Sequence, residues 1–192
     1  MNITEIIVHR GNSPVNKTKP LDQASYYAEN GFKQIEIDIY ATSETTYKFC
    51  HPVDSDRVVE THTLDDDFLE KFVARFPDTT WFVDVKCLDL HEVPTKLLQF
   101  LVDTFKDTDV FTAAQHEILE FAHNAHRKTA QYFKDTIEPS LNYTPEFFVQ
   151  VDSEDRGLQK SSTLAFCPDV ATALKRIEEG YAGVIVDGDK LI

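Results

Sequence analysis

Short apolar or β-branched runs alternate with longer segments of helical periodicity along the chain. Each short run predicts a strand, and these runs lie at residues 6–8, 34–40, 81–86, 110–114, 132–133, 147–149, 163–166 and 183–186, with a hairpin strand at 47–51. The longer segments predict helices at residues 21–29, 65–74, 93–105, 117–128 and 170–179. Regular alternation of strand and helix is typical of a parallel sheet.

The number of strand–helix units, about eight, favours a compact (β/α)₈ TIM barrel over an open doubly wound sheet. The chain has 192 residues, which is just below the usual lower size of about 200 for such a barrel. We therefore expect some of its helices to be short or missing. No internal repeat or linker divides the sequence, which indicates a single domain over residues 1–192.

Alternation is clearest in the segment 34–40. Ile35, Ile37 and Ile39 share one face of the predicted strand, whereas Glu36 and Asp38 share the other. In a barrel, both carboxylates would point the same way into the mouth, although the pair alone also fits the solvated face of an edge strand.

Other polar side chains lie at the carboxyl ends of predicted strands. His9 and Arg10 follow the first strand, and His51 ends the hairpin strand. Asp84 and Lys86 lie two residues apart on the strand 81–86, so both point the same way. Because active sites of parallel barrels form at the carboxyl ends of the strands, we expect these groups to meet at one mouth.

The overall charge narrows the classes of partner. The chain has 19 Lys and Arg against 33 Asp and Glu, for a formal net charge of −14. Such a charge repels a phosphate backbone and disfavours nucleic-acid binding. A small phosphate-containing substrate stays compatible with it, because a bound metal ion can reverse the field locally.

The cysteines and the N-terminus bear on location. Cys50, Cys87 and Cys167 form neither a disulfide framework nor a zinc-binding pattern. The N-terminus lacks the features of a signal peptide, and no apolar run approaches the length of about 20 residues that spans a bilayer. These features predict a reduced, cytoplasmic protein with no membrane span.

The acidic residues suggest a metal. Glu36, Asp38 and Asp84 would repel one another at one mouth unless a cation lay between them. Oxygen-only ligands suit Mg²⁺ or Ca²⁺ better than zinc. Two nearby histidines suit acid–base work close to neutral pH, and Arg10 offers a bidentate fork for a phosphate.

Three ordered motifs resemble the glycerophosphodiester phosphodiesterase family. They are the HRG of residues 9–11, the E-x-D of residues 36–38, and a second histidine, His51, followed by Pro52. Residues 84–86 resemble the family's E-x-K element with Asp in place of Glu, and residues 180–187 resemble its closing strand. The resemblance spans nearly the whole chain and is sharpest over residues 7–52.

This resemblance implies a barrel of the phosphoinositide-phospholipase-C-like kind, a divalent metal, and hydrolysis of a phosphodiester of lipid metabolism with an alcohol leaving group. The implied roles are acid–base catalysis for His9 and His51, metal binding for Glu36, Asp38 and Asp84, and phosphate binding for Arg10 and Lys86. Which histidine is the acid and which the base does not follow from the sequence.

The chain departs from the family pattern in three places. The family's P-E-N-T element is replaced by residues 16–20, which contain no Glu. Asp84 is one methylene shorter than the usual Glu. The segment between His51 and Asp84 is short, which indicates that the family's inserted subdomain is missing. Since that subdomain covers the mouth, the choice of substrate is not carried over.

Two other functions compete with hydrolysis. A phospholipase-D-like transfer that forms a cyclic phosphate shares the two histidines, the E-x-D pair and the Asp. Alternatively, a non-catalytic barrel would bind a phosphorylated ligand or a protein partner. The missing subdomain also leaves room for a homodimer that buries the mouth.

Some residues have simpler structural interpretations. Asp84 and Lys86 form an ion pair inside the barrel in one of them. His116, Glu120 and His123 share one helix face, and we interpret them as a polar surface in preference to a metal site.

Overall fold

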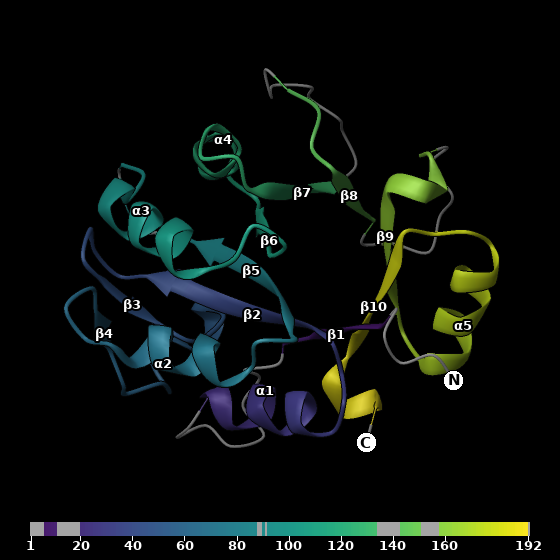
Figure 1. The fold of residues 1–192 in the computed structure, drawn as a ribbon, viewed down its shortest axis with the longest axis horizontal. Helices are drawn as coiled ribbons and strands as arrows, with labels where there is room; N and C mark the ends of the chain where they lie inside the picture. Colours follow the sequence, from purple (N-terminus) through teal and green to yellow (C-terminus); the bar gives the residue numbers. More distant parts are fainter. Residues whose placement is uncertain are drawn as a thin grey trace.

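Eight parallel strands in the described part of the chain form a closed barrel in the computed structural model (Figure 1). The structure describes residues 6–10, 20–87, 90, 92–133, 143–150 and 158–191. The barrel strands are β1 (Ile6–His9), β2 (Gln34–Ala41), β5 (Thr80–Lys86), β6 (Val110–Ala113), β7 (Lys128–Phe133), β8 (Phe147–Gln150), β9 (Thr163–Cys167) and β10 (Gly183–Asp187). The predicted (β/α)₈ TIM barrel is confirmed.

The barrel closes through β1, which pairs in parallel with strands from both ends of the sequence. It pairs with β10 along residues 6–9 and 184–187, and with β2 through Ile7 and Val8. From β2 the order runs through β5, β6, β7, β8 and β9 to β10. Because all eight strands are parallel, their carboxyl ends lie at one mouth.

Short helices surround the barrel (Figure 1). They are α1 (Pro20–Glu29), α2 (Phe68–Arg75), α3 (Thr95–Thr104), α4 (His116–Asn124) and α5 (Val170–Glu178). Each spans eight to ten residues. Between β8 and β9 the described residues contain only the 3₁₀ turn η4 (Lys160–Ser162). The expectation of short helices is thus confirmed for the described segments.

The two faces of the strands bury different side chains. Ile35, Ile37 and Ile39 of β2 are fully buried in the cluster that also contains residues of α2, α3 and α4. Burying each such side chain contributes about 1.5–3 kcal/mol. The interior of the barrel holds a separate apolar cluster that includes Ile7 and Phe82. Polar side chains on the inner face therefore lie next to this apolar cluster, near the carboxyl ends of the strands.

The hairpin after β2 is shorter than predicted. β3 (Thr46–Lys48) pairs antiparallel with β2 and with β4 (His62–Thr63). The strand predicted at residues 47–51 ends at Lys48, and Pro52 opens the 3₁₀ turn η3 (Pro52–Asp54). Proline is favoured at the first position of a helical turn because its missing N–H is not needed there. His51 is the N-cap of this turn.

The boundary between α4 and β7 also differs from the predicted one. The helix predicted over residues 117–128 ends at Asn124, and Lys128 already begins β7. His126 has a φ of 60°, and the N–H of Arg127 donates to the carbonyl of Ala122, as in a Schellman motif. Glycine usually takes this left-handed position. A histidine in its place removed the usual signal for the end of the helix.

Two smaller findings concern the expectations about location. Cys50, Cys87 and Cys167 are buried and unpaired. Within the described residues, no helix is both long enough and apolar enough to cross a membrane.

Candidate functional site

Three carboxylates meet inside the mouth of the barrel, as the sequence predicted. Glu36, Asp38 and Asp84 are at most 4% exposed. Asp38 and Asp84 are direct neighbours across the β2–β5 pair, and one oxygen from each of the three side chains lies within 4.8 Å of the others. No other group of three candidate metal ligands exists among the described residues. This acidic cluster could hold a metal ion.

The hydrogen bonds leave one oxygen free on two of these carboxylates. Glu36 Oε2 accepts a 2.5 Å hydrogen bond from the backbone N–H of Arg10, whereas Glu36 Oε1 is buried without a partner among the described residues. Asp84 Oδ2 accepts from Lys86 Nζ and from Tyr132 Oη, whereas Asp84 Oδ1 is likewise buried and unsatisfied by any described residue. A buried carboxylate oxygen without a donor is costly, so both free oxygens fit a cation.

The electrostatics of the cluster favour the same conclusion. Burial and the nearby Asp84 charge raise the pKa of Glu36 from 4.5 to about 8. Burial and the Glu36 charge raise the pKa of Asp38 well above its usual range. The protein alone therefore disfavours three ionised carboxylates at this position. A divalent cation would reverse that preference and take up the negative charge.

Lys86 lies inside the carboxylate cluster. Its Nζ donates to Asp84 Oδ2 and is 3.6 Å from Asp38 Oδ1. Burial lowers the pKa of Lys86, but the Asp84 and Asp38 charges outweigh burial and the net change is upward, so the ammonium stays charged. When a bound cation keeps all three carboxylates ionised, the Lys86 charge leaves a net of two negative charges, which matches a divalent ion. The ion pair between Asp84 and Lys86 considered from the sequence is present.

His9 is held by a residue that the sequence analysis did not identify. Its Nδ1 lies 2.5 Å from Asp187 Oδ1, and its ring packs edge-on against Phe166, with centroids 4.7 Å apart. Burial lowers the pKa of His9 although Asp187 opposes the change. A neutral ring that donates from Nδ1 has its lone pair on Nε2, and Nε2 is 3.9 Å from Glu36 Oε2.

The contact of Asp187 with His9 depends on the closure of the barrel. It ends β10, and its register partner on β1 is His9 itself. The two residues are separated by 178 positions in sequence, so no local pattern links them. The available signal was that Asp187 ends the segment 180–187, which resembles the closing strand of the family.

Arg10 has a backbone conformation that is uncommon for a residue with a side chain. Its φ is 50°, in the left-handed region. This conformation accompanies the hydrogen bond from its N–H to Glu36 Oε2. Its Nε is buried with no partner among the described residues. An unsatisfied guanidinium nitrogen beside the carboxylate cluster fits an anionic group such as a phosphate.

His51 approaches the mouth from the hairpin side. Its Nδ1 accepts a long hydrogen bond of 3.4 Å from the N–H of Val53. Burial, followed by the charges of Lys86 and Arg10, lowers its pKa. His51 is therefore close enough to the side chains of Lys86 and Arg10 for their positive charges to lower its pKa.

Tyr132 is the second residue that the sequence analysis missed. It reaches from β7 to Asp84, and its Oη donates to Asp84 Oδ2 over 2.6 Å. No sequence pattern indicates this contact, because residues 132–133 predict only a short strand.

Other residues singled out from the sequence lie away from this cluster. On α4, the ring of His123 stacks on Tyr143 with centroids 3.8 Å apart, and His116 Nε2 is 3.2 Å from Gln131 Nε2. Neither histidine belongs to the acidic group described above. Of residues 16–20, which replace the P-E-N-T element, residues 16–19 lie outside the described part of the chain, and Pro20 begins α1.

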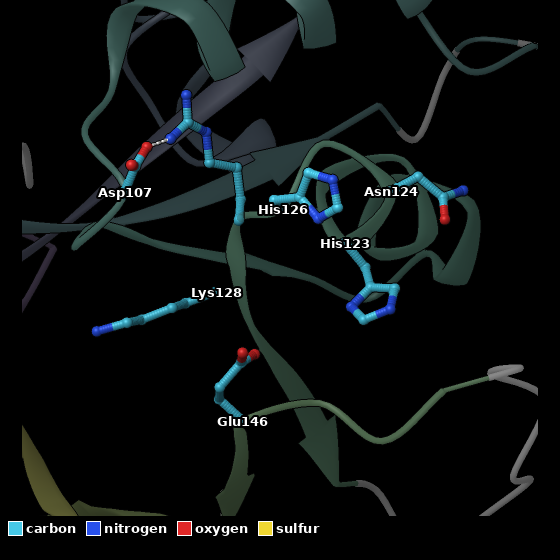
Figure 2. Close-up of a pocket in the computed structure, with 7 residues that line it drawn as sticks. Asp107, His123, Asn124, His126, Lys128 and Glu146 are labelled. Carbon is cyan, nitrogen blue, oxygen red and sulfur yellow. Dashed lines mark hydrogen bonds and ion pairs between the residues drawn. The ribbon is translucent and has the colours of Figure 1, made fainter.

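A separate surface pocket lies at the opposite end of the barrel. Figure 2 shows it, with Lys128 at the start of β7 and Glu146 just before β8. His123 and His126 line it from the end of α4. Because it lies at the amino ends of these strands, it is distant from the mouth where the carboxylates gather. Arg127 in this pocket is already bound to Asp107 and to the carbonyl of Val102.

Comparison with known proteins identifies the fold. No protein-family model matches the sequence, and no curated protein matches it significantly. In structure, the chain is similar to an Oleispira antarctica phosphodiesterase solved in complex with its product sn-glycerol-3-phosphate, with a TM-score of 0.63, 14% identity, and coverage of 97% of this chain and 93% of that one. It is also similar to a glycerophosphodiester phosphodiesterase from Agrobacterium tumefaciens, with a TM-score of 0.61, 13% identity, and coverage of 96% and 95%. The fold expected from the motif resemblance is thus confirmed.

Proposed function

We propose that this chain, which has the fold of the glycerophosphodiester phosphodiesterases, is a metal-dependent phosphodiester hydrolase. One observation carries the proposal. At one mouth of the barrel, a buried acidic cluster with free carboxylate oxygens lies beside His9, which is hydrogen-bonded to Asp187. A metal site can stabilise charge on a phosphoryl group, and a histidine beside it can transfer the protons of hydrolysis. A barrel that only bound a ligand would have no use for the pairing of His9 with Asp187.

Glu36, Asp38 and Asp84 would hold the cation, with Glu36 Oε1 and Asp84 Oδ1 as the free ligand atoms. A site made only of oxygens suits Mg²⁺ or Ca²⁺. When bound, such an ion supplies positive charge that stabilises the negative oxygens of a phosphoryl group.

The two histidines would divide the proton transfers. We assign the base to His9, because its Nδ1–H is held by Asp187 and its Nε2 is left to accept a proton from the attacking oxygen. Asp187 then stabilises the imidazolium that forms. His51 takes the other role and donates a proton to the oxygen of the leaving alcohol.

Arg10 and Lys86 would bind the phosphate. Arg10 has a buried Nε that no described residue satisfies. Lys86 places its Nζ near Asp84 and Asp38, and an ammonium has three N–H donors. A third N–H is thus left for a phosphate oxygen at the edge of the acidic cluster.

The substrate class is a glycerophosphodiester-like small molecule. The Oleispira antarctica neighbour was solved with sn-glycerol-3-phosphate as its product. We propose that the present chain likewise releases a phosphomonoester of this kind from its substrate. The net charge of −14 favours a small substrate over a polyanion.

The assignment of His9 predicts the effect of Asp187→Asn. We expect kcat to fall by about 10²- to 10⁴-fold, because the amide no longer holds the imidazole in the required tautomer and orientation. The Asp187 side chain is 45% exposed, so the fold should survive. Since Asp187 raises the pKa of His9, its loss should move the acidic limb of the kcat/KM profile to lower pH.

Asp189→Asn is the matched control for this variant. Its side chain is exposed and pairs with Lys190, so the same chemical change two residues away should leave kcat and the pH profile unchanged. Equal kcat in Asp187→Asn and Asp189→Asn would contradict the role given to Asp187.

Phosphorus NMR of the product tests the reaction type. With glycerophosphocholine and Mg²⁺ or Ca²⁺, hydrolysis yields a phosphomonoester. A cyclic phosphodiester as the final product would instead indicate transfer to a hydroxyl of the substrate itself.

A further inference from the structure

Tyr132 makes a contact across the barrel interior that the proposed reaction does not by itself require. It lies on β7, and β6 separates that strand from β5, which carries Asp84. Tyr132 lines a small interior cavity together with apolar side chains such as Phe82 and Val149 and with the polar residues His9, Glu36 and Thr112. Its hydroxyl donates a 2.6 Å hydrogen bond to Asp84 Oδ2.

This hydrogen bond makes the two oxygens of Asp84 unequal. Oδ2 accepts from Tyr132 Oη and from Lys86 Nζ. Oδ1 is buried with no partner in the described part of the chain. Two donors on one oxygen therefore fix the rotation of the carboxylate, which is otherwise soft about its last torsion.

We propose that Tyr132 is a positioning residue that holds Asp84 Oδ2 so that Asp84 Oδ1 faces the bound cation. The inference rests on the proposed metal site and names a residue that controls it. A metal ligand must be held within about 0.5 Å of its productive position, and Asp84 has only one methylene with which to reach. The backbone position of Asp84 alone does not determine the orientation of its carboxylate, and the hydrogen bond from Tyr132 supplies that orientation.

The tyrosine suits this role because it remains a donor. A phenol ordinarily carries its proton at neutral pH, and the Tyr132 O–H donates it to Asp84 Oδ2 over 2.6 Å. The Lys86 Nζ lies 5.6 Å from the centroid of the Tyr132 ring, a distance at which the ring face attracts the ammonium. Tyr132 therefore supports both the acidic ligand and the cationic neighbour of that ligand.

Calorimetric titration of the Tyr132→Phe variant with Mg²⁺ and with Ca²⁺ tests the proposal. Phenylalanine keeps the ring and removes the one donor. We expect the metal affinity to fall by about 10- to 100-fold, as for other residues that orient a metal ligand. Tyr47→Phe is the matched control, because it makes the same chemical change at a buried tyrosine whose neighbouring charges are Asp66 and Glu70, outside the acidic cluster. Its affinity for both ions should equal that of the unchanged protein.

The outcomes separate this inference from the proposed function. An unchanged protein that binds neither ion would defeat the proposed function. Metal binding that is the same in the unchanged protein and in Tyr132→Phe would defeat only the role of Tyr132. A raised KM with unchanged metal affinity would also overturn it, because Tyr132 would then contact substrate.

A double-mutant cycle tests whether Tyr132 acts through Asp84. Once Asp84→Asn has removed the ligand, Tyr132→Phe should have little further effect on metal affinity. Additive losses in the cycle would show that Tyr132 acts independently of Asp84 and would overturn the proposal.

Discussion

Replacing His9 or His51 by alanine should lower kcat for phosphodiester hydrolysis by about 10²- to 10⁴-fold, the usual contribution of a general acid or base. His9 loses a base whose Nδ1 is held 2.5 Å from Asp187. His51 loses the second group that moves protons. Steady-state kinetics on a glycerophosphodiester, with saturating metal, measures the effect.

The fold should tolerate both changes. His51 caps a short turn through one long hydrogen bond of 3.4 Å, and His9 lies at the end of its strand. Circular dichroism and thermal melting should therefore show folded variants. His123→Ala serves as the control, because His123 lines the pocket at the other end of the barrel (Figure 2). Normal turnover in both His9→Ala and His51→Ala would contradict the proposed acid–base pair.

Glu36→Gln should weaken metal binding and at the same time stabilise the metal-free protein. The amide cannot supply the charge that a divalent ion needs, so we expect the affinity for Mg²⁺ and Ca²⁺ to fall by about 100-fold or more, beyond the loss typical of supporting residues. The amide does relieve the cost of a buried carboxylate, and we expect a gain in the free energy of unfolding in EDTA at high pH.

The sign of the pH effect follows from the raised pKa of Glu36. The folded protein holds a proton up to about pH 8, whereas the unfolded chain releases it near 4.5. The free energy of unfolding contributed by this group therefore falls as the pH rises through that interval. Urea unfolding in EDTA at about pH 5 and about pH 8 should show a smaller pH dependence in Glu36→Gln.

Glu178→Gln, an exposed change on α5, provides the comparison for overall charge. It should leave both the metal affinity and the pH dependence of unfolding as they are. If Glu36→Gln bound metal as tightly as the unchanged protein, or unfolded with the same pH dependence as Glu178→Gln, the buried carboxylate site would be wrong.

Much of the fold and of the acidic cluster could be predicted because the signals are local. The alternation of isoleucines with Glu36 and Asp38 on one strand sets which side chains face inward. Asp84 and Lys86 follow the same rule on β5. Because all barrel strands are parallel, knowing that a residue ends a strand is enough to bring it to the mouth.

The remaining features depend on contacts between distant parts of the chain. Asp187 meets His9 only because β10 closes against β1, and Tyr132 meets Asp84 only because β7 faces the same interior. The hydrogen bonds that distinguish the oxygens of Asp84 cannot be derived from residue spacing. The end of α4 was misplaced for another reason, since His126 takes a backbone conformation that usually indicates glycine.

Metal-dependent turnover is the most direct test of the proposed function. The protein would be assayed on a panel of glycerophosphodiesters and an aryl phosphodiester with Mg²⁺, Ca²⁺ or Mn²⁺, and again with EDTA. We expect hydrolysis that EDTA abolishes and that excess Mg²⁺ or Ca²⁺ restores. Turnover that persists in EDTA would contradict the metal site, and folded protein with neither turnover nor metal binding would contradict the enzyme itself.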